Sequence, residues 1–117
     1  MSAAVHVIQL RGPWECETTG RAERFDWERD AAVLAAEGPL TLVRRFGRPS
    51  GIEPGDRVWL VIAGFASAEV SLNDARVDEL RCDVAGLLAA RNTLRIVGLR
   101  SAEVPQVRLE IEPAAVT

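Results

Sequence analysis

Trp27, Arg44 and Arg45 have side chains of the types that could contact a sugar. Sugars have apolar C–H faces that stack on indole rings, and polar rims that accept hydrogen bonds from groups such as guanidinium. Trp27 lies among charges in "RFDWERD" and is the tryptophan least committed to a core. Trp14 and Trp59 lie beside apolar neighbours in strand-like segments, so we favour core packing for both. Trp27, Arg44 and Arg45 are therefore the candidate ligand-binding residues.

Arg44 is the more informative of the two arginines. In "LTLVRRF", the alternation of side chains places Arg44 on the same face as Leu42 and Phe46. A guanidinium on an otherwise apolar face must find a carboxylate or backbone carbonyl groups. Arg44 therefore either has a structural partner, which we favour, or lines a concave sheet face where a ligand binds. Arg45 and Arg48 complete a local basic cluster.

No catalytic constellation is visible in the sequence. His6 is the only histidine and has no metal-ligand spacing to a cysteine or carboxylate, so we expect a structural role for it and no metal site. Glu15 and Glu17 share one face of a strand, where such charges are usually solvated. The chain also lacks a nucleophile elbow, a Walker loop and a dinucleotide-binding glycine motif. We predict no enzyme activity and no cofactor.

Composition limits the class of partner. The 117 residues have a formal net charge of −3, which argues against a nucleic-acid-binding surface. No window reaches the ~18 apolar residues of a membrane span, and the N-terminus does not resemble a signal peptide, so a cytoplasmic location is expected. A disulfide between Cys16 and Cys82 is formally possible, but two buried thiols are the favoured alternative.

The period of the apolar residues predicts an all-β fold. Two-residue alternation recurs in about eight short segments separated by Gly, Pro and Asn, which is typical of a β-sandwich. Only residues 27–37 show helical spacing, and an irregular excursion with one helical turn is the alternative there. We predict one jelly-roll sandwich domain over residues 1–117, with at most that one short helix and a frayed tail at 113–117.

Four polar residues are predicted to shape the turns. Asn73 and Asp74 form a tight hairpin turn, because short polar side chains tolerate positive backbone φ angles. Asp83 precedes "VAGLL" and can accept backbone N–H bonds at a short helical turn. Asn92 can close the next turn before the chain re-enters the sheet.

The order of these segments resembles a known family. In that family an early "L-x-G-x-W-x-F" is followed by a strand ending in "Y-R-R-x-F-x-x-P", an apolar strand, a "V-x-V-N-G" hairpin, an "F-D-[VI]-T-x-L-L" segment and "G-x-N-x-L-x-[VI]". They read here as "LRGPWEC", "LVRRFGRP", "RVWLVIAGF", "VSLND", "RCDVAGLL" and "ARNTLRI". Over residues 8–112 the chain resembles the galactose-binding-domain-like jelly roll, in the variant that forms the non-catalytic sugar-binding domain of family-two glycoside hydrolases, such as β-galactosidases and β-glucuronidases.

The resemblance implies a non-catalytic binding or accessory domain whose ligand is a saccharide. The sequence departs from the family pattern at Cys82, where an aromatic residue is usual, at Asp74, where Gly is usual, and at Ala85, where Thr is usual. These departures weaken the transfer of polar ligand contacts. Aromatic residues are only 5% of the chain, which is poor for a glycan binder. A protein-interaction or structural domain with no sugar site is the alternative, so the expected partner is a saccharide or another protein.

Overall fold

The computed structural model describes a β-sandwich built from the alternating segments. It describes residues 5–11, 14–16, 23–25, 40–100 and 105–114. The elements in chain order are β1 (His6–Gln9), β2 (Trp14–Cys16), β3 (Glu23–Phe25), β4 (Leu40–Gly47), β5 (Arg57–Ala63), β6 (Phe65–Leu72), β7 (Ala75–Val77), β8 (Arg81–Asp83), the 3-10 turn η1 (Ala85–Leu87), β9 (Arg91–Arg100) and β10 (Gln106–Glu112).

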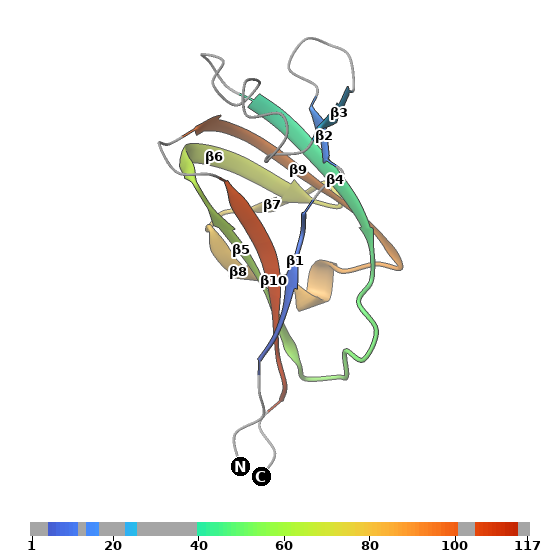
Figure 1. Ribbon diagram of the computed structural model, residues 1–117. Coiled ribbons are helices and arrows are strands. Elements are labelled where there is room, and N and C mark those ends of the chain that lie inside the picture. The colour runs from blue at the N-terminus through green and yellow to red at the C-terminus, as the bar shows by residue number, and fades with distance from the viewer. Residues whose placement is uncertain (1–4, 12–13, 17–22, 26–39, 101–104, 115–117) are drawn as a thin grey trace.

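Two antiparallel sheets face each other (Figure 1). One has the strand order β1-β10-β5-β8 and the other the order β3-β2-β4-β9-β6-β7. From β4 to β6, and again from β8 to β10, successive strands alternate between the two sheets, as in a jelly roll. The predicted all-β sandwich is confirmed. The structure describes ten strands where about eight were expected, and four of them, β2, β3, β7 and β8, are only three residues long.

Helical structure in the described part of the chain is limited to η1. The helix predicted over residues 27–37 lies outside the described residues. Within the described ranges, no helix is long and apolar enough to cross a membrane.

The core lies between the sheets and is formed by one face of each strand. In β10, Val107, Leu109 and Ile111 point inward, as their alternation with Arg108 and Glu110 predicts. Side chains alternate in the same way in the strands of both sheets. The fully buried large side chains are Trp14, Leu42, Leu60, Leu72, Leu94, Ile96, Leu109, Val58 and Val84. The Trp14 indole N–H donates to the Leu10 carbonyl at 2.9 Å, so its one polar group is satisfied within the core. Cys16 and Cys82 are free thiols.

A pair of asparagines, the only two in the sequence, joins the turns at one end of the sandwich. Asn73 and Asp74 have φ angles of 53° and 67°, as the tight β6–β7 turn requires. The Asn73 side-chain amide donates to the Asn92 side-chain oxygen and to the Leu87 carbonyl, both at 2.9 Å. Asn73 Oδ1 accepts the Thr93 backbone N–H at 2.9 Å. The β6–β7 turn is thereby fastened to the start of β9.

Asn92 extends this network to β4. It is only 2% exposed, and its amide donates to the carbonyl groups of Phe46 at 3.3 Å and Ala89 at 3.0 Å. Its side-chain oxygen also accepts the Ala89 backbone N–H at 2.8 Å. Asp83 accepts the Ala85 N–H at 3.1 Å and the Val58 N–H at 3.2 Å. The turn-forming roles predicted for these residues are what the geometry shows. Asn92 fixes the end of the β4–β9 pair, and Asp83 joins η1 to β5.

Candidate functional site

A hollow of about 590 Å³ lies at the end of the β4–β9 pair. We call it the β4–β9 hollow, and its lining residues are Arg45, Phe46, Gly47, Ala90, Arg91, Asn92 and Thr93. This volume lies within the range of small-molecule sites in proteins, about 300–1,000 Å³.

Gly47 forms the floor of the β4–β9 hollow. In the antiparallel register of β4 and β9, Gly47 is opposite Arg91 and Arg45 is opposite Thr93. Since side chains alternate along a strand, these four positions share the outer face of the six-stranded sheet. Because Gly47 has no side chain, its position leaves a gap beside the other three side chains. A Cβ added there would meet only the Ala90 carbonyl oxygen, at 3.9 Å, so the space above Gly47 is open.

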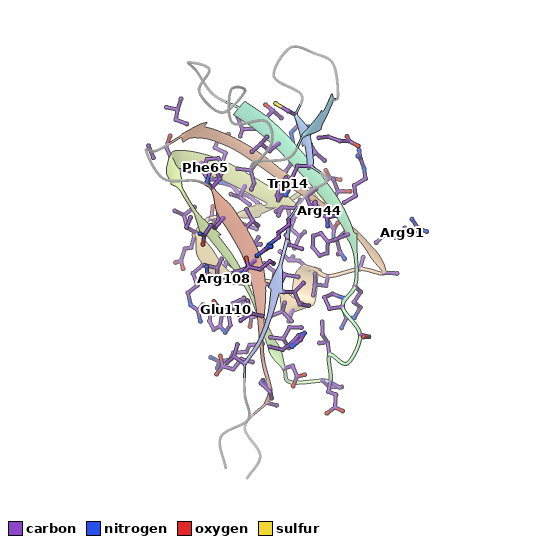
Figure 2. The ribbon with its side chains drawn as sticks, viewed as in Figure 1. Trp14, Arg44, Phe65, Arg91, Arg108 and Glu110 are labelled. Carbon is purple, nitrogen blue, oxygen red and sulfur yellow. The ribbon has the colours of Figure 1, made fainter. Side chains whose placement is uncertain are left out.

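Two arginines flank this floor. Arg45 is ion-paired with Glu15 of β2, with 2.7 Å between Arg45 Nη1 and Glu15 Oε1, and its side chain is 60% exposed. An exposed pair of this kind contributes at most about 1 kcal/mol, so its main effect is to orient the guanidinium. Arg91 is exposed and projects away from the sandwich at the start of β9 (Figure 2). Arg91 forms no ion pair with any residue in the described part of the chain.

The β4–β9 hollow offers hydrogen-bond donors to a ligand. Asn92 is part of its wall, but the Asn92 amide is already bonded to Phe46, Ala89 and Asn73. The Arg91 guanidinium and the Thr93 hydroxyl lie on the exposed rim, and the Arg45 guanidinium lies there in its ion pair with Glu15. Guanidinium is a permanent cation and a donor only, so this set can bind oxygen-rich ligands but cannot exchange protons with them near pH 7.

Arg44 points into the sandwich and away from this hollow. Its Nε donates to the Arg11 carbonyl at 2.9 Å, and its Nη1 donates to the Arg45 carbonyl. The alternation along β4 places it on the same face as the buried Leu42. Partial burial lowers the pKa of Arg44 from its ordinary value by desolvation. The carbonyl partners match the structural alternative favoured from the sequence.

Arg44→Ala is expected to lower the free energy of unfolding by about 1–2 kcal/mol, because charge-assisted bonds to two carbonyl groups are lost. Arg45→Ala is the matched control, since it removes an exposed pair worth at most about 1 kcal/mol. Thermal melts of the two variants beside the wild type measure the difference. An unchanged melting curve for Arg44→Ala would remove its structural role.

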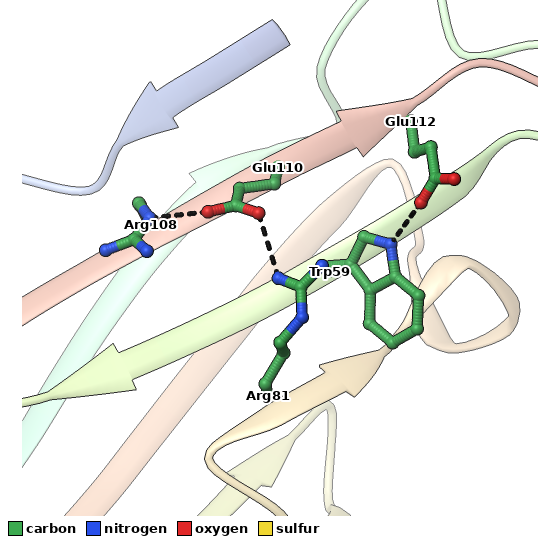
Figure 3. Close-up of polar contacts among 5 residues, drawn as sticks. All are labelled: Trp59, Arg81, Arg108, Glu110 and Glu112. Atoms are coloured by element: carbon green, nitrogen blue, oxygen red, sulfur yellow. Dashed lines mark hydrogen bonds and ion pairs between the residues drawn. The ribbon is translucent and has the colours of Figure 1, made fainter. Parts of the chain in front are cut away.

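The tryptophans do not provide an open stacking platform among the described residues. Trp14 is fully buried, as expected, and Trp27 lies outside the described residues. The core position expected for Trp59 is wrong. Trp59 is half-buried on the outer face of the four-stranded sheet, where its indole N–H donates to Glu112 at 2.8 Å. The Arg81 guanidinium lies 4.5 Å from the ring centroid (Figure 3) and the Arg57 guanidinium lies 5.9 Å from it, so a sugar would have to compete with these cation–π contacts for the ring.

Glu110 links this cluster together. It accepts Arg108 Nε at 2.7 Å and Arg81 Nη1 at 2.9 Å (Figure 3). The hydrogen bond from Arg108 and then that from Arg81 hold the pKa of Glu110 below its ordinary value. Arg81 is thus fixed between Glu110 and the Trp59 ring, which indicates a structural role for the whole cluster.

The depressed pKa of Glu110 predicts a pH-dependent contribution to stability. The ionised form is favoured in the folded state, so the contribution is present above the unfolded pKa and is lost as pH falls through the folded pKa. Glu110→Gln is therefore expected to be less stable than the wild type at pH 7, by about 0.5–1 kcal/mol, with a smaller gap at pH 3. Urea unfolding at both pH values measures the gap. An equal gap at both would contradict the assignment.

Comparisons with known proteins agree with the fold. No protein-family model and no curated protein sequence matches the chain. Among solved structures, the chain is similar to part of the FMN-binding β-glucuronidase from Facaelibacterium prausnitzii L2-6, with a TM-score of 0.68 and 22% sequence identity. The similarity covers 93% of this chain and 23% of the glucuronidase chain. At this identity it shows the fold: the chain has the sandwich of one segment of a much longer glycoside hydrolase.

Of the two candidates among the described residues, Arg45 lines the β4–β9 hollow and Arg44 does not. Gly47, Arg91 and Thr93 were missed. Gly47 had a weak signal, since it follows the alternating "LTLVRRF" directly and could have been read as the last residue of that strand. Nothing in the local sequence places Arg91 opposite Gly47, because that neighbour relation depends on how β4 pairs with β9.

Proposed function

We propose that the chain is a non-catalytic accessory domain that binds a saccharide in the β4–β9 hollow. The observation that carries the proposal is an open floor at Gly47 between donors on Arg45, Arg91 and Thr93, in a hollow of about 590 Å³. Saccharide hydroxyl groups accept hydrogen bonds of this kind. The similarity of the sandwich to a segment of a β-glucuronidase supports a carbohydrate-related role.

The composition of the hollow supports a role in binding rather than in cleavage. Glycoside hydrolysis uses two carboxyl groups placed about 5–10 Å apart across the scissile bond. Among the described residues, the lining of the β4–β9 hollow has no carboxylate and no histidine. The neighbouring Glu15 is held by Arg45. The donor set can therefore orient a saccharide without a general acid or base to break it.

A glycan array with the wild type and Gly47→Leu tests the proposal. The leucine side chain has room above the floor and would occupy the hollow, so binding is expected to be lost while the melting temperature is kept. Gly86→Leu is the matched control, because a Cβ at Gly86 meets nothing within 4 Å and Gly86 lies outside the hollow. A wild-type chain that binds no glycan, or a Gly47→Leu variant that binds as well as Gly86→Leu, would overturn the proposal.

A protein-interaction domain is the second candidate, and the edge strand β1 favours it. Among the described strands, β1 pairs only with β10, and Val5 and Val7 at this edge are 47% and 46% exposed. An unpaired strand edge with exposed valines is a surface on which another chain can add a strand. This role predicts that Val7→Lys abolishes a protein complex and leaves saccharide binding intact. Loss of saccharide binding in Gly47→Leu alone favours the first candidate.

A further inference from the structure

The lining of the β4–β9 hollow is cationic in a chain that is acidic overall. Its described residues include two arginines and no carboxylate, whereas the chain has a formal net charge of −3. A second hollow, of about 240 Å³ on the same sheet, provides a comparison. Glu69, Asp74, Arg76 and Arg95 line it, so its charges balance. Glu15, which is outside the lining, balances Arg45, so the excess of positive charge in the β4–β9 hollow comes from Arg91.

The two guanidinium groups flank one floor from two strands. Arg45 and Arg91 are diagonal neighbours on the outer face, because Arg45 is opposite Thr93 and Gly47 is opposite Arg91. Diagonal neighbours in an antiparallel pair have backbone positions roughly 7–8 Å apart, so two long side chains can reach one group between them. Gly47, below that point, leaves the space for the group.

The two arginines differ in their contacts, and Arg91 is the one available to an anion. Glu15 contacts Arg45 from β2, and β2 lies on the side of β4 away from β9. The hollow itself, between Arg45 and Arg91, lies toward β9. Arg91 forms no ion pair with a described residue, so a bound anion there displaces water and not a protein carboxylate. Planar guanidinium forks match the oxygen geometry of carboxylate and sulfate groups.

We propose that the saccharide bound in the β4–β9 hollow is anionic, and that Arg45 and Arg91 together hold its carboxylate or sulfate group above Gly47. This inference rests on the proposed function, because it names the ligand class for the same hollow. Arg91 is the principal contact. Arg45, oriented by Glu15, is the second.

Calorimetric titration with charge-matched ligand pairs tests this. Oligogalacturonate is compared with its fully methyl-esterified form, and sulfated dextran oligomers are compared with unsulfated ones. The members of each pair differ mainly in charge. The first pair tests a carboxylate ligand and the second tests a sulfate ligand. We expect at least one anionic form to bind at least tenfold more tightly than its neutral counterpart. This binding is expected to weaken when the NaCl concentration is raised from about 50 to about 500 mM. Arg91→Gln is expected to remove most of the advantage of the anionic form. Arg57→Gln is the matched control, since it removes the same charge from an exposed residue on the other sheet.

The outcomes distinguish this inference from the proposed function. Equal binding of charged and neutral forms that is still blocked by Gly47→Leu overturns the anionic ligand and leaves the saccharide site standing. Binding of neither form overturns both. Anionic binding that is lost equally in Arg91→Gln and Arg57→Gln reflects general charge attraction and overturns the assignment to Arg45 and Arg91.

Discussion

Asn92→Ala is expected to lower the free energy of unfolding by about 3–4 kcal/mol, which is the largest effect anticipated for a single substitution. The Asn92 side chain is 2% exposed and takes part in four hydrogen bonds. Alanine removes both acceptor bonds and both donor bonds, and it leaves the partner groups with no replacement. Each buried polar group that loses its partner costs about 1–3 kcal/mol, with part regained where water enters.

A double-mutant cycle with Asn73 sharpens this prediction. The two asparagines share the bond from the Asn73 amide to the Asn92 oxygen, at 2.9 Å. Asn73→Ala and Asn92→Ala are therefore expected to be non-additive, with a coupling of about 1 kcal/mol or more. Chemical denaturation of the wild type, both single variants and the double variant measures it. An Asn92→Ala variant within about 1 kcal/mol of the wild type would show that the network contributes little.

Gly98→Ala is expected to cost about 2–3 kcal/mol through overpacking. Gly98 is buried in β9, opposite Ala68 of β6. A Cβ at this position would lie 2.8 Å from Phe65 Cδ1 and 2.9 Å from the Ser67 backbone carbonyl oxygen. The ring can rotate, but the carbonyl belongs to the β6 backbone at the irregularity between Phe65 and Ser67, so the strand itself must move. A glycine is required here because two backbones approach each other closely.

Gly47→Ala is the matched control for Gly98→Ala, since both residues lie in the β4–β9 pair. The nearest atom to a Cβ at Gly47 is at 3.9 Å, so this change is expected to alter stability by less than about 0.5 kcal/mol. Urea unfolding of the two variants gives the comparison. Equal stabilities for Gly98→Ala and Gly47→Ala would mean that the close approach at Gly98 relaxes at little cost.

The parts of the fold that depend on local pattern could be predicted from the sequence. The alternation of Val107, Leu109 and Ile111 with charged residues placed β10 correctly, and the polar pair Asn73-Asp74 identified the hairpin turn. Both features depend on neighbours along the chain, and both signals are strong.

The position of Trp59 could not be predicted, because β5 is apolar on both of its faces. Local alternation does not say which face of such a strand is buried. Trp59 is held on the outer face by contacts with Arg81 and Glu112, which reach it from the neighbouring strands β8 and β10. The β4–β9 hollow was missed for the same reason. Arg45 was a candidate by type, but its relation to Gly47 and Arg91 exists only once β4 and β9 are paired.

An NMR titration of the ¹⁵N-labelled chain tests the proposed site most directly, with a neutral galacto-oligosaccharide and oligogalacturonate added in parallel. We expect saturable shifts of the backbone amides of Gly47, Arg91 and Thr93 with at least one of the two ligands, while the amides of Leu60 and Leu109 in the opposite sheet stay in place. Shifts centred on Trp59 and Arg81, or no shift at Gly47, Arg91 and Thr93 with either ligand, would contradict it.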